Sequence, residues 1–267
     1  MTKIEKIFGY FGRQSLQFFT HLSKIGSLSK KALYWTIIAP LKGKGLRWKS
    51  TIDQMVLIGV NSIPIVAVIC FFVGLILAMQ AAYQLERFGA SIYVADLVGV
   101  SMTREMGPLL TAIIIAGRSG SAIAAEIGTM KVYEEIDALH TMGFNSTKFL
   151  VVPRLLALLI MLPCLTLIAD IVGILGGFFL AIFNLKISFL RYLNQTAEAL
   201  VMKDLITGLI KTLIFAVIIA KVGCYQGFSV KGGAEGVGKA TTASVVTSIF
   251  LIIVADLVCT MLFYSTL

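Results

Sequence analysis

The chain has 267 residues, of which 58% are hydrophobic and only 14% are charged. An average soluble domain carries about 25% charged residues, so this composition and a mean hydropathy of +0.91 exclude an ordinary soluble fold. The net charge of +9 raises the alternative of nucleic-acid binding, which we do not expect because long apolar runs fill the rest of the chain.

Residues 1–50 carry ten Lys or Arg residues and one acid, Glu5. A basic flank before the first hydrophobic segment is typical of a cytoplasmic region that faces anionic lipid. Within it, residues 4–25 place apolar side chains at helical spacing among cations, which predicts an amphipathic helix at the membrane interface. Some fifty residues precede the first long apolar run, which disfavours a secretory signal.

Five later segments are long and apolar enough to cross a bilayer core, which needs roughly 20 helical residues. The first is longer than the hydrocarbon needs, so it should tilt or kink, with Pro64 and Gly74 as the natural kink sites. The third should be broken at Pro153, Pro163 and a glycine cluster from Gly173. The five predicted spans run from about Met55 to Leu85, Ile92 to Ala116, Phe149 to Phe183, Leu205 to Phe228 and Thr241 to Phe263.

These patterns predict an all-α integral membrane protein with a single domain over residues 1–267. Residues 1–50 form its cytoplasmic and interfacial region, and residues 51–267 form the five-span region. The basic N-terminus places residues 117–148 and 229–240 in the cytoplasm and the C-terminus in the periplasm, across an inner membrane. Three cations on the opposite side fit this charge rule poorly: Lys186, Arg191 and Lys203.

Arg104 and Glu105 are adjacent charges inside the second predicted span. Charged side chains are expensive in a bilayer and usually face an interior cavity, so the pair suggests a polar patch beside a lipid or solute head group. Structural ion pairing, or pairing with backbone freed at Gly107 and Pro108, is the alternative. Four other ionisable residues lie in or near spans and either act there or reach towards water: Asp96, Asp170, Lys211 and Asp256.

The segment after the second span changes character along its length. Residues 116–131 are rich in Gly, Ala and Ser, which permits close packing of backbones. Residues 132–143 are short, polar and acidic, which predicts a cytoplasmic surface helix that docks into a partner's groove. A solvated connector is the alternative.

Residues 233–239 approach the pattern of a phosphate-binding loop, but Ala240 stands where a hydroxyl should bind magnesium. A flexible turn between helices explains these glycines better. The four cysteines lie singly in apolar runs and support neither a zinc site nor a disulfide framework. We therefore expect no catalytic residue, metal or cofactor on this chain.

Two motifs closely resemble the MlaE/YrbE permease family. The first is T-R-E-M-G-P-L-L-T-A-I-I-I-A-G-R-S-G-S-A-I-A-A-E-I-G-T-M-K at Thr103–Lys131, and the second is G-V-G-K-A-T-T at Gly236–Thr242. The resemblance covers roughly residues 8 to 265. One departure is Ala243, where some relatives carry an Arg.

This resemblance implies a homodimeric permease at the centre of an ABC transporter that moves phospholipid between the inner membrane and the outer envelope. The implied partners are a cytoplasmic ATPase that binds the ATP and magnesium, often a small STAS-domain protein, and a periplasmic MCE-domain ring. The lipid site would comprise Leu77, Leu85, Phe88, Arg104 and Glu105. The ATPase would dock at Glu126, Lys131, Glu134, Glu135, Asp137, Leu139 and Gly143.

Two other classes are open to a chain of this composition. An ion-coupled secondary transporter of a lipophilic or anionic solute is disfavoured because five spans do not divide into two inverted repeats. An intramembrane enzyme would need a nucleophile and a base within the spans, and the sequence shows no such pair.

Overall fold

The computed structural model describes residues 47–265, so the amphipathic helix expected over residues 4–25 lies outside the described residues. Every regular element in the described part is a helix. Five of its helical segments are long and apolar enough to cross a membrane: Trp48–Phe88, Ser91–Val132, Thr147–Phe183, Met202–Phe228 and Ala234–Phe263. The predicted all-α membrane fold with five spans is confirmed.

The first span consists of α3 (Trp48–Ile58), a 3₁₀ turn (Val60–Ser62) and α4 (Ile63–Leu85). The break falls just before Pro64, which lies in the first turn of α4, where its missing N–H costs least. At Gly74, the other kink site expected, α4 continues without interruption. Gly74 instead permits close approach, since a Cβ there would overlap the backbone of Gly173 in α9.

The second span alternates between α and π geometry. It comprises α5 (Val94–Ser101), a π-helical turn (Met102–Met106), α6 (Gly107–Ile115), a second π turn (Ala116–Gly120) and α7 (Ser121–Val132). The predicted end near Ala116 is therefore wrong, because the helix continues to Val132. Small residues on α7 allow this continuation to pack closely, as at Gly128, where a Cβ would lie 2.8 Å from Val230.

The third span is a π turn (Thr147–Val151) followed by α9 (Val152–Phe183). The breaks expected within it are wrong, since Pro153 occupies the first turn of α9 and Pro163 lies inside an otherwise continuous helix. Gly173 and Gly176 pack against α4 rather than ending the helix.

The remaining elements are α8 (Glu135–Thr141), α10 (Phe189–Ala199), α11 (Met202–Phe228) and α12 (Ala234–Ser265). The glycine-rich loop expected over residues 229–240 is wrong in extent, because α12 begins at Ala234 and only residues 229–233 connect the helices. The segment that resembles a phosphate-binding loop is thus mostly the start of a membrane-spanning helix.

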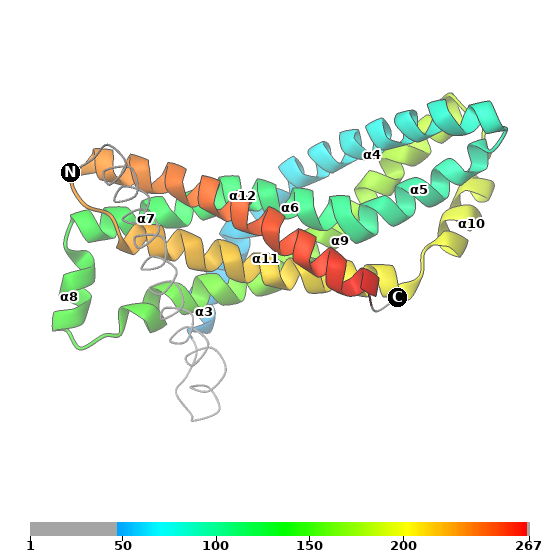
Figure 1. Cartoon of the computed structure of the whole chain (residues 1–267). Coiled ribbons are helices and arrows are strands. Elements are labelled where there is room, and N and C mark those ends of the chain that lie inside the picture. The colour runs from blue at the N-terminus through cyan, green and yellow to red at the C-terminus, as the bar shows by residue number, and fades with distance from the viewer. Residues whose placement is uncertain (1–46, 266–267) are drawn as a thin grey trace, which may run out of the picture.

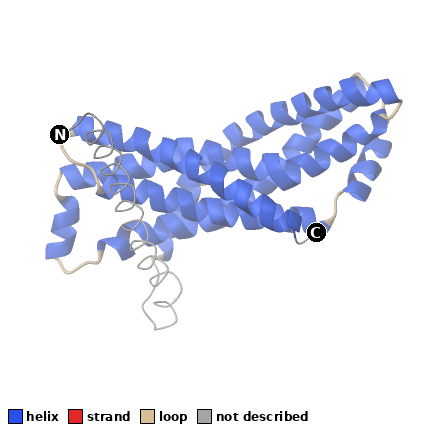
Figure 2. Ribbon diagram, in the orientation of Figure 1, coloured by secondary structure: helices blue, strands red, loops and turns tan. Residues whose placement is uncertain are grey.

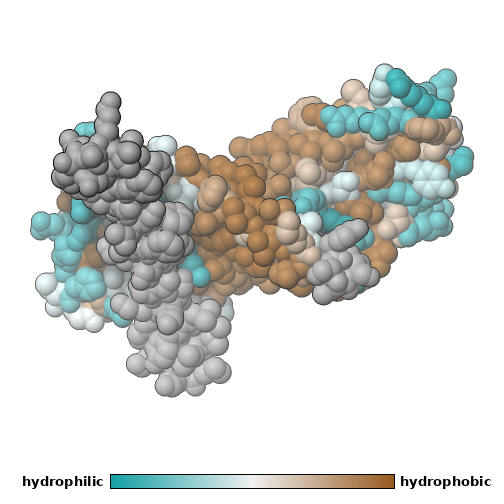
Figure 3. Space-filling view, viewed as in Figure 1, coloured by the Kyte–Doolittle hydropathy of each residue, from teal (hydrophilic) through white to brown (hydrophobic). Residues whose placement is uncertain are grey.

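The helices lie side by side in one elongated bundle (Figures 1 and 2). The short helix α8 stands at one end, beside α7, and α10 stands at the opposite end. A hydrophobic band covers the middle of the molecule, and hydrophilic surface is concentrated at both ends (Figure 3). Helix α4 packs mainly on α9, whereas α11 packs on α12, α7 and α9. The bundle therefore presents α8 and α10 on opposite sides of a membrane.

Candidate functional site

The π turn at Met102–Met106 carries Arg104 and Glu105. Pro108 follows in the first turn of α6 and has no N–H to close a regular helical bond, which favours a local irregularity. The Thr103 hydroxyl also donates to the Gly99 carbonyl oxygen at 3.0 Å. Single π turns occur frequently at functional sites, and this one sets two consecutive charges inside a span.

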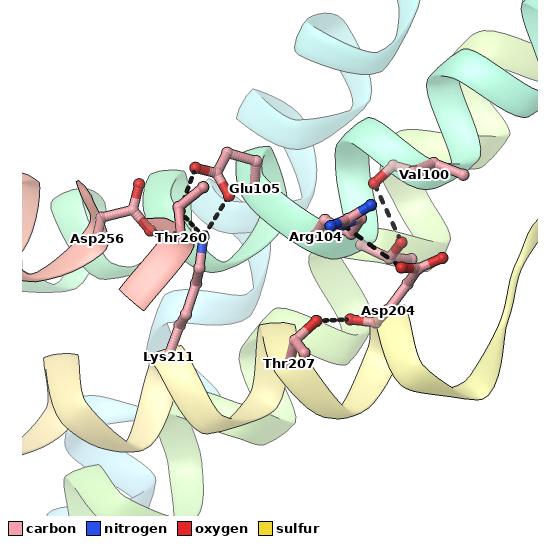
Figure 4. Close-up of polar contacts among 9 residues, drawn as sticks. Val100, Arg104, Glu105, Asp204, Thr207, Lys211, Asp256 and Thr260 are labelled. Carbon is pink, nitrogen blue, oxygen red and sulfur yellow. Dashed lines mark hydrogen bonds and ion pairs between the residues drawn. The ribbon is translucent and has the colours of Figure 1, made fainter. Parts of the chain in front are cut away.

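Arg104 and Glu105 engage different partners on α11, so they do not pair with each other. The Arg104 Nε lies 3.4 Å from an oxygen of Asp204, which is in the first turn of α11. Glu105 forms an ion pair with Lys211, two turns further along the same helix (Figure 4). The π turn is thereby held to α11 at two points.

Lys211 is the centre of a polar network that joins three spans (Figure 4). Its ammonium contacts Glu105, lies 2.9 Å from an Asp256 oxygen and donates to the Thr260 hydroxyl at 2.8 Å. The Thr260 hydroxyl in turn donates to Glu105 at 3.1 Å. Only 3% of the Lys211 side chain is exposed, compared with 32% for Glu105. Lys211 therefore does not extend towards water, and its charge is compensated inside the bundle.

We call the six residues of this region the Glu105 cluster: Arg104, Glu105, Asp204, Lys211, Asp256 and Thr260. The sequence predicted Arg104 and Glu105 as site residues. For Lys211 and Asp256 it allowed either a functional role or a position at the membrane interface. Asp204 and Thr260 were missed. The signal for Asp204 was its position at the boundary of the fourth span, but only the fold shows that it faces Arg104.

The other ionisable residues of the spans have separate surroundings. Asp170 is buried on α9, and the backbone of Gly107 lies directly against its carboxyl group. Asp96 accepts a hydrogen bond from the Gln195 amide at 2.9 Å, which ties α5 to α10. Arg118, on the second π turn, donates to the Ser62 hydroxyl and to the Leu57 carbonyl at the break in the first span.

The apolar residues expected beside a lipid are divided in the structure. Leu77 and Leu85 on α4 are partly buried and pack on a cluster that includes Met102. Met106 belongs to the same group, so the α4 residues adjoin the ends of the π turn. Phe88 lies in the 3₁₀ turn after α4 and is 82% exposed, outside this cluster.

The residues expected to dock a partner surround α8. Glu134 and Gly143, which precede and follow this helix, both have positive φ, 60° and 77°, so two sharp turns set α8 apart from its neighbours. The Lys131 ammonium lies 2.9 Å from Asp137 and bridges α7 and α8. Glu135 is exposed, whereas Leu139 packs partly against the main core.

Glu126, the remaining residue of that set, lies on α7 and forms a 2.7 Å ion pair with Arg154 of α9. Arg154 is buried and also donates to the Leu150 carbonyl at 2.7 Å. This contact ties α7 to the third span close to α8.

Five apolar spans, charges compensated between helices and a short polar helix beyond the hydrophobic band define a multi-pass membrane protein. Residues 51–262 match the family described as Permease MlaE, and the chain belongs to this family. It is 42% identical over 241 residues to a probable ABC transporter permease protein of Rickettsia prowazekii, covering 90% of this chain and 88% of the relative.

Two more distant relatives come from photosynthetic organisms. A probable ABC transporter permease protein of Synechocystis is 40% identical over 208 residues, which are 78% of this chain and 79% of that protein. The chloroplastic protein TRIGALACTOSYLDIACYLGLYCEROL 1 of Arabidopsis thaliana is 34% identical over 231 residues, which are 86% of this chain and 65% of the relative.

Proposed function

We propose that this permease is the membrane-spanning subunit of an ABC transporter that moves phospholipid between the inner membrane and the outer envelope. It acts as a homodimer, and a separate cytoplasmic ATPase binds the ATP and magnesium and supplies the energy. A periplasmic MCE-domain ring receives or delivers the lipid, and a STAS-domain protein joins the ATPase side. The resemblance of the Thr103–Lys131 motif supports this assembly.

The observation that carries the proposal is the continuity between α8 and the Glu105 cluster. One helical segment, Ser91–Val132, contains both the charged π turn and α7, and α8 follows it after a two-residue turn. A displacement of α8 is therefore transmitted along a continuous helical segment to Arg104 and Glu105. The Lys131–Asp137 contact fixes α8 to the end of this element.

Close packing at the same end supports the transmission of movement to the other spans. A Cβ at Gly227 of α11 would lie 2.7 Å from Ile127 of α7, and one at Gly223 would lie 3.1 Å from the Gly120 carbonyl oxygen. The Ser244 hydroxyl of α12 also donates to that carbonyl, at 3.3 Å. Helices packed without intervening side chains move together, since closely packed interfaces deform little.

In the proposed mechanism, closure of the ATPase pair displaces α8, and α7 and the closely packed α11 move with it. The Glu105–Lys211 and Arg104–Asp204 contacts join the π turn of the second span to α11, so this movement changes the groups that face a bound head group. Arg104 holds the lipid phosphate, and the exposed apolar surfaces of the spans accommodate the acyl chains. Apolar side chains with large exposed fractions, such as Phe72 at 57% and Phe250 at 59%, supply such surface.

The docking step can be tested by co-purification of the ATPase with charge-reversed α8. Glu135→Lys should lose the ATPase, because partner recognition by a surface helix depends on complementary charge. Glu198→Lys on α10 is the matched control, because it makes a similar change at the opposite end of the bundle. Retention of the ATPase by the α8 variant, at the level of the control, would count against the proposed docking site.

A further inference from the structure

The Glu105 cluster carries an excess of negative charge. Its two cations, Arg104 and Lys211, face three carboxylates, those of Glu105, Asp204 and Asp256. With all five groups ionised, one negative charge is left uncompensated. Neither of two other nearby ionisable residues compensates this charge. Asp170, buried behind Gly107, is itself an acid, and Lys203 is exposed on α11.

Only some of these groups are accessible to a ligand. Lys211 is buried, and its ammonium donates to Glu105 and Thr260 and lies 2.9 Å from Asp256, so it is not exposed to a ligand. Arg104 is 39% exposed, and within residues 47–265 its guanidinium is engaged only through Nε. Glu105 is 32% exposed. A ligand therefore meets one guanidinium and one carboxylate.

These two groups come from consecutive residues of a π turn. Arg104 turns towards Asp204 and Glu105 towards Lys211, so the two groups do not pair with each other (Figure 4). The guanidinium is suited to a phosphate, which it binds with two N–H groups. The carboxylate is suited to a cation that carries N–H donors.

We infer, on the basis of the proposed function, that the site selects a zwitterionic phospholipid with a primary ammonium over an anionic phospholipid. The phosphate lies against Arg104 and the ammonium against Glu105. Because the ammonium balances the lipid's own phosphate, a zwitterionic head group leaves the excess of the cluster at one negative charge. An anionic head group instead adds a second uncompensated charge, and opposite charges favour binding where like charges oppose it.

A lipid competition experiment tests this selectivity. The purified full-length chain is equilibrated in neutral detergent with equal amounts of phosphatidylethanolamine and phosphatidylglycerol of identical acyl chains, and retained lipid is quantified by native mass spectrometry. The ethanolamine lipid should be retained at least about fivefold more, equivalent to about 1 kcal/mol. Glu105→Gln should reduce the ratio towards unity, whereas the exposed control Glu198→Gln should leave it unchanged.

Asp256→Asn removes one negative charge at a different residue and should also reduce the ratio of retained ethanolamine lipid to glycerol lipid. This variant replaces Glu105→Gln in the test if the Glu105 variant does not fold. Equal retention of the two lipids by the unmodified chain overturns the inference, and it is the result expected if a bound proton neutralises the excess charge. Preference for the anionic lipid overturns it as well. Retention of neither lipid would instead contradict the proposed lipid-binding function.

Discussion

Replacement of Lys211 by Met should destabilise the fold strongly. The substitution preserves much of the apolar stem but removes the ammonium that lies between Glu105 and Asp256. Breaking a buried ion pair by removing one partner costs about 3–5 kcal/mol, because the other charge is left uncompensated. We expect the lower end, about 3 kcal/mol, because Glu105 is 32% exposed and its surroundings screen its charge.

The assay is thermal unfolding of the purified chain in detergent, followed by loss of helical circular dichroism. For a chain of this size, about 3 kcal/mol corresponds to a fall of about 6–12 °C in Tm. Adding Glu105→Gln and Asp256→Leu to the same chain should restore most of the loss, because the carboxylates left uncompensated are then removed. Lys203→Met, at an exposed position, should shift Tm by about 2 °C or less. A similar small shift for Lys211→Met would refute the structural role of the network.

Three further predictions concern other parts of the bundle. Gly74→Ala should cost about 1–3 kcal/mol in a thermal unfolding assay because its Cβ would overlap the α9 backbone, whereas Gly117→Ala, in open space, should cost nothing. Cysteines placed at His140 of α8 and Asn194 of α10 should react with membrane-impermeant thiol reagents from opposite sides; labelling from one side would contradict the topology. Burial raises the pKa of Tyr192 from 10.0 to about 12. Its contribution to stability is therefore complete below pH 10 and is lost as the pH rises towards 12, a loss that Tyr192→Phe should abolish in alkaline unfolding curves.

Apolar run length was sufficient to predict the five spans, because bilayer thickness sets the number of residues that a crossing helix needs. The same reasoning failed where small and helix-breaking residues were interpreted locally. Gly74 and Gly173 were expected to bend or end helices, yet they form the contact between α4 and α9. The low helix propensity of glycine costs only about 1 kcal/mol per residue, and tertiary packing that brings two backbones together overrides it.

The candidate site was predictable only in part. A charge inside an apolar run is visible in the sequence, which is why Arg104, Glu105, Lys211 and Asp256 were all noticed. The pairing of Glu105 with Lys211 and of Arg104 with Asp204 depends on the rotation of the second span against α11, and the π turn sets that rotation. The sequence contains no direct signal for a π turn.

The central claim is that movement delivered at α8 acts on lipid held beside Glu105. Its most direct test is ATP-dependent phospholipid transfer by the chain reconstituted with its ATPase, compared between the unmodified chain and Glu105→Lys. We expect the variant to keep the ATPase bound and hydrolysing ATP while lipid transfer is lost. Lipid transfer at the unmodified rate would contradict the claim.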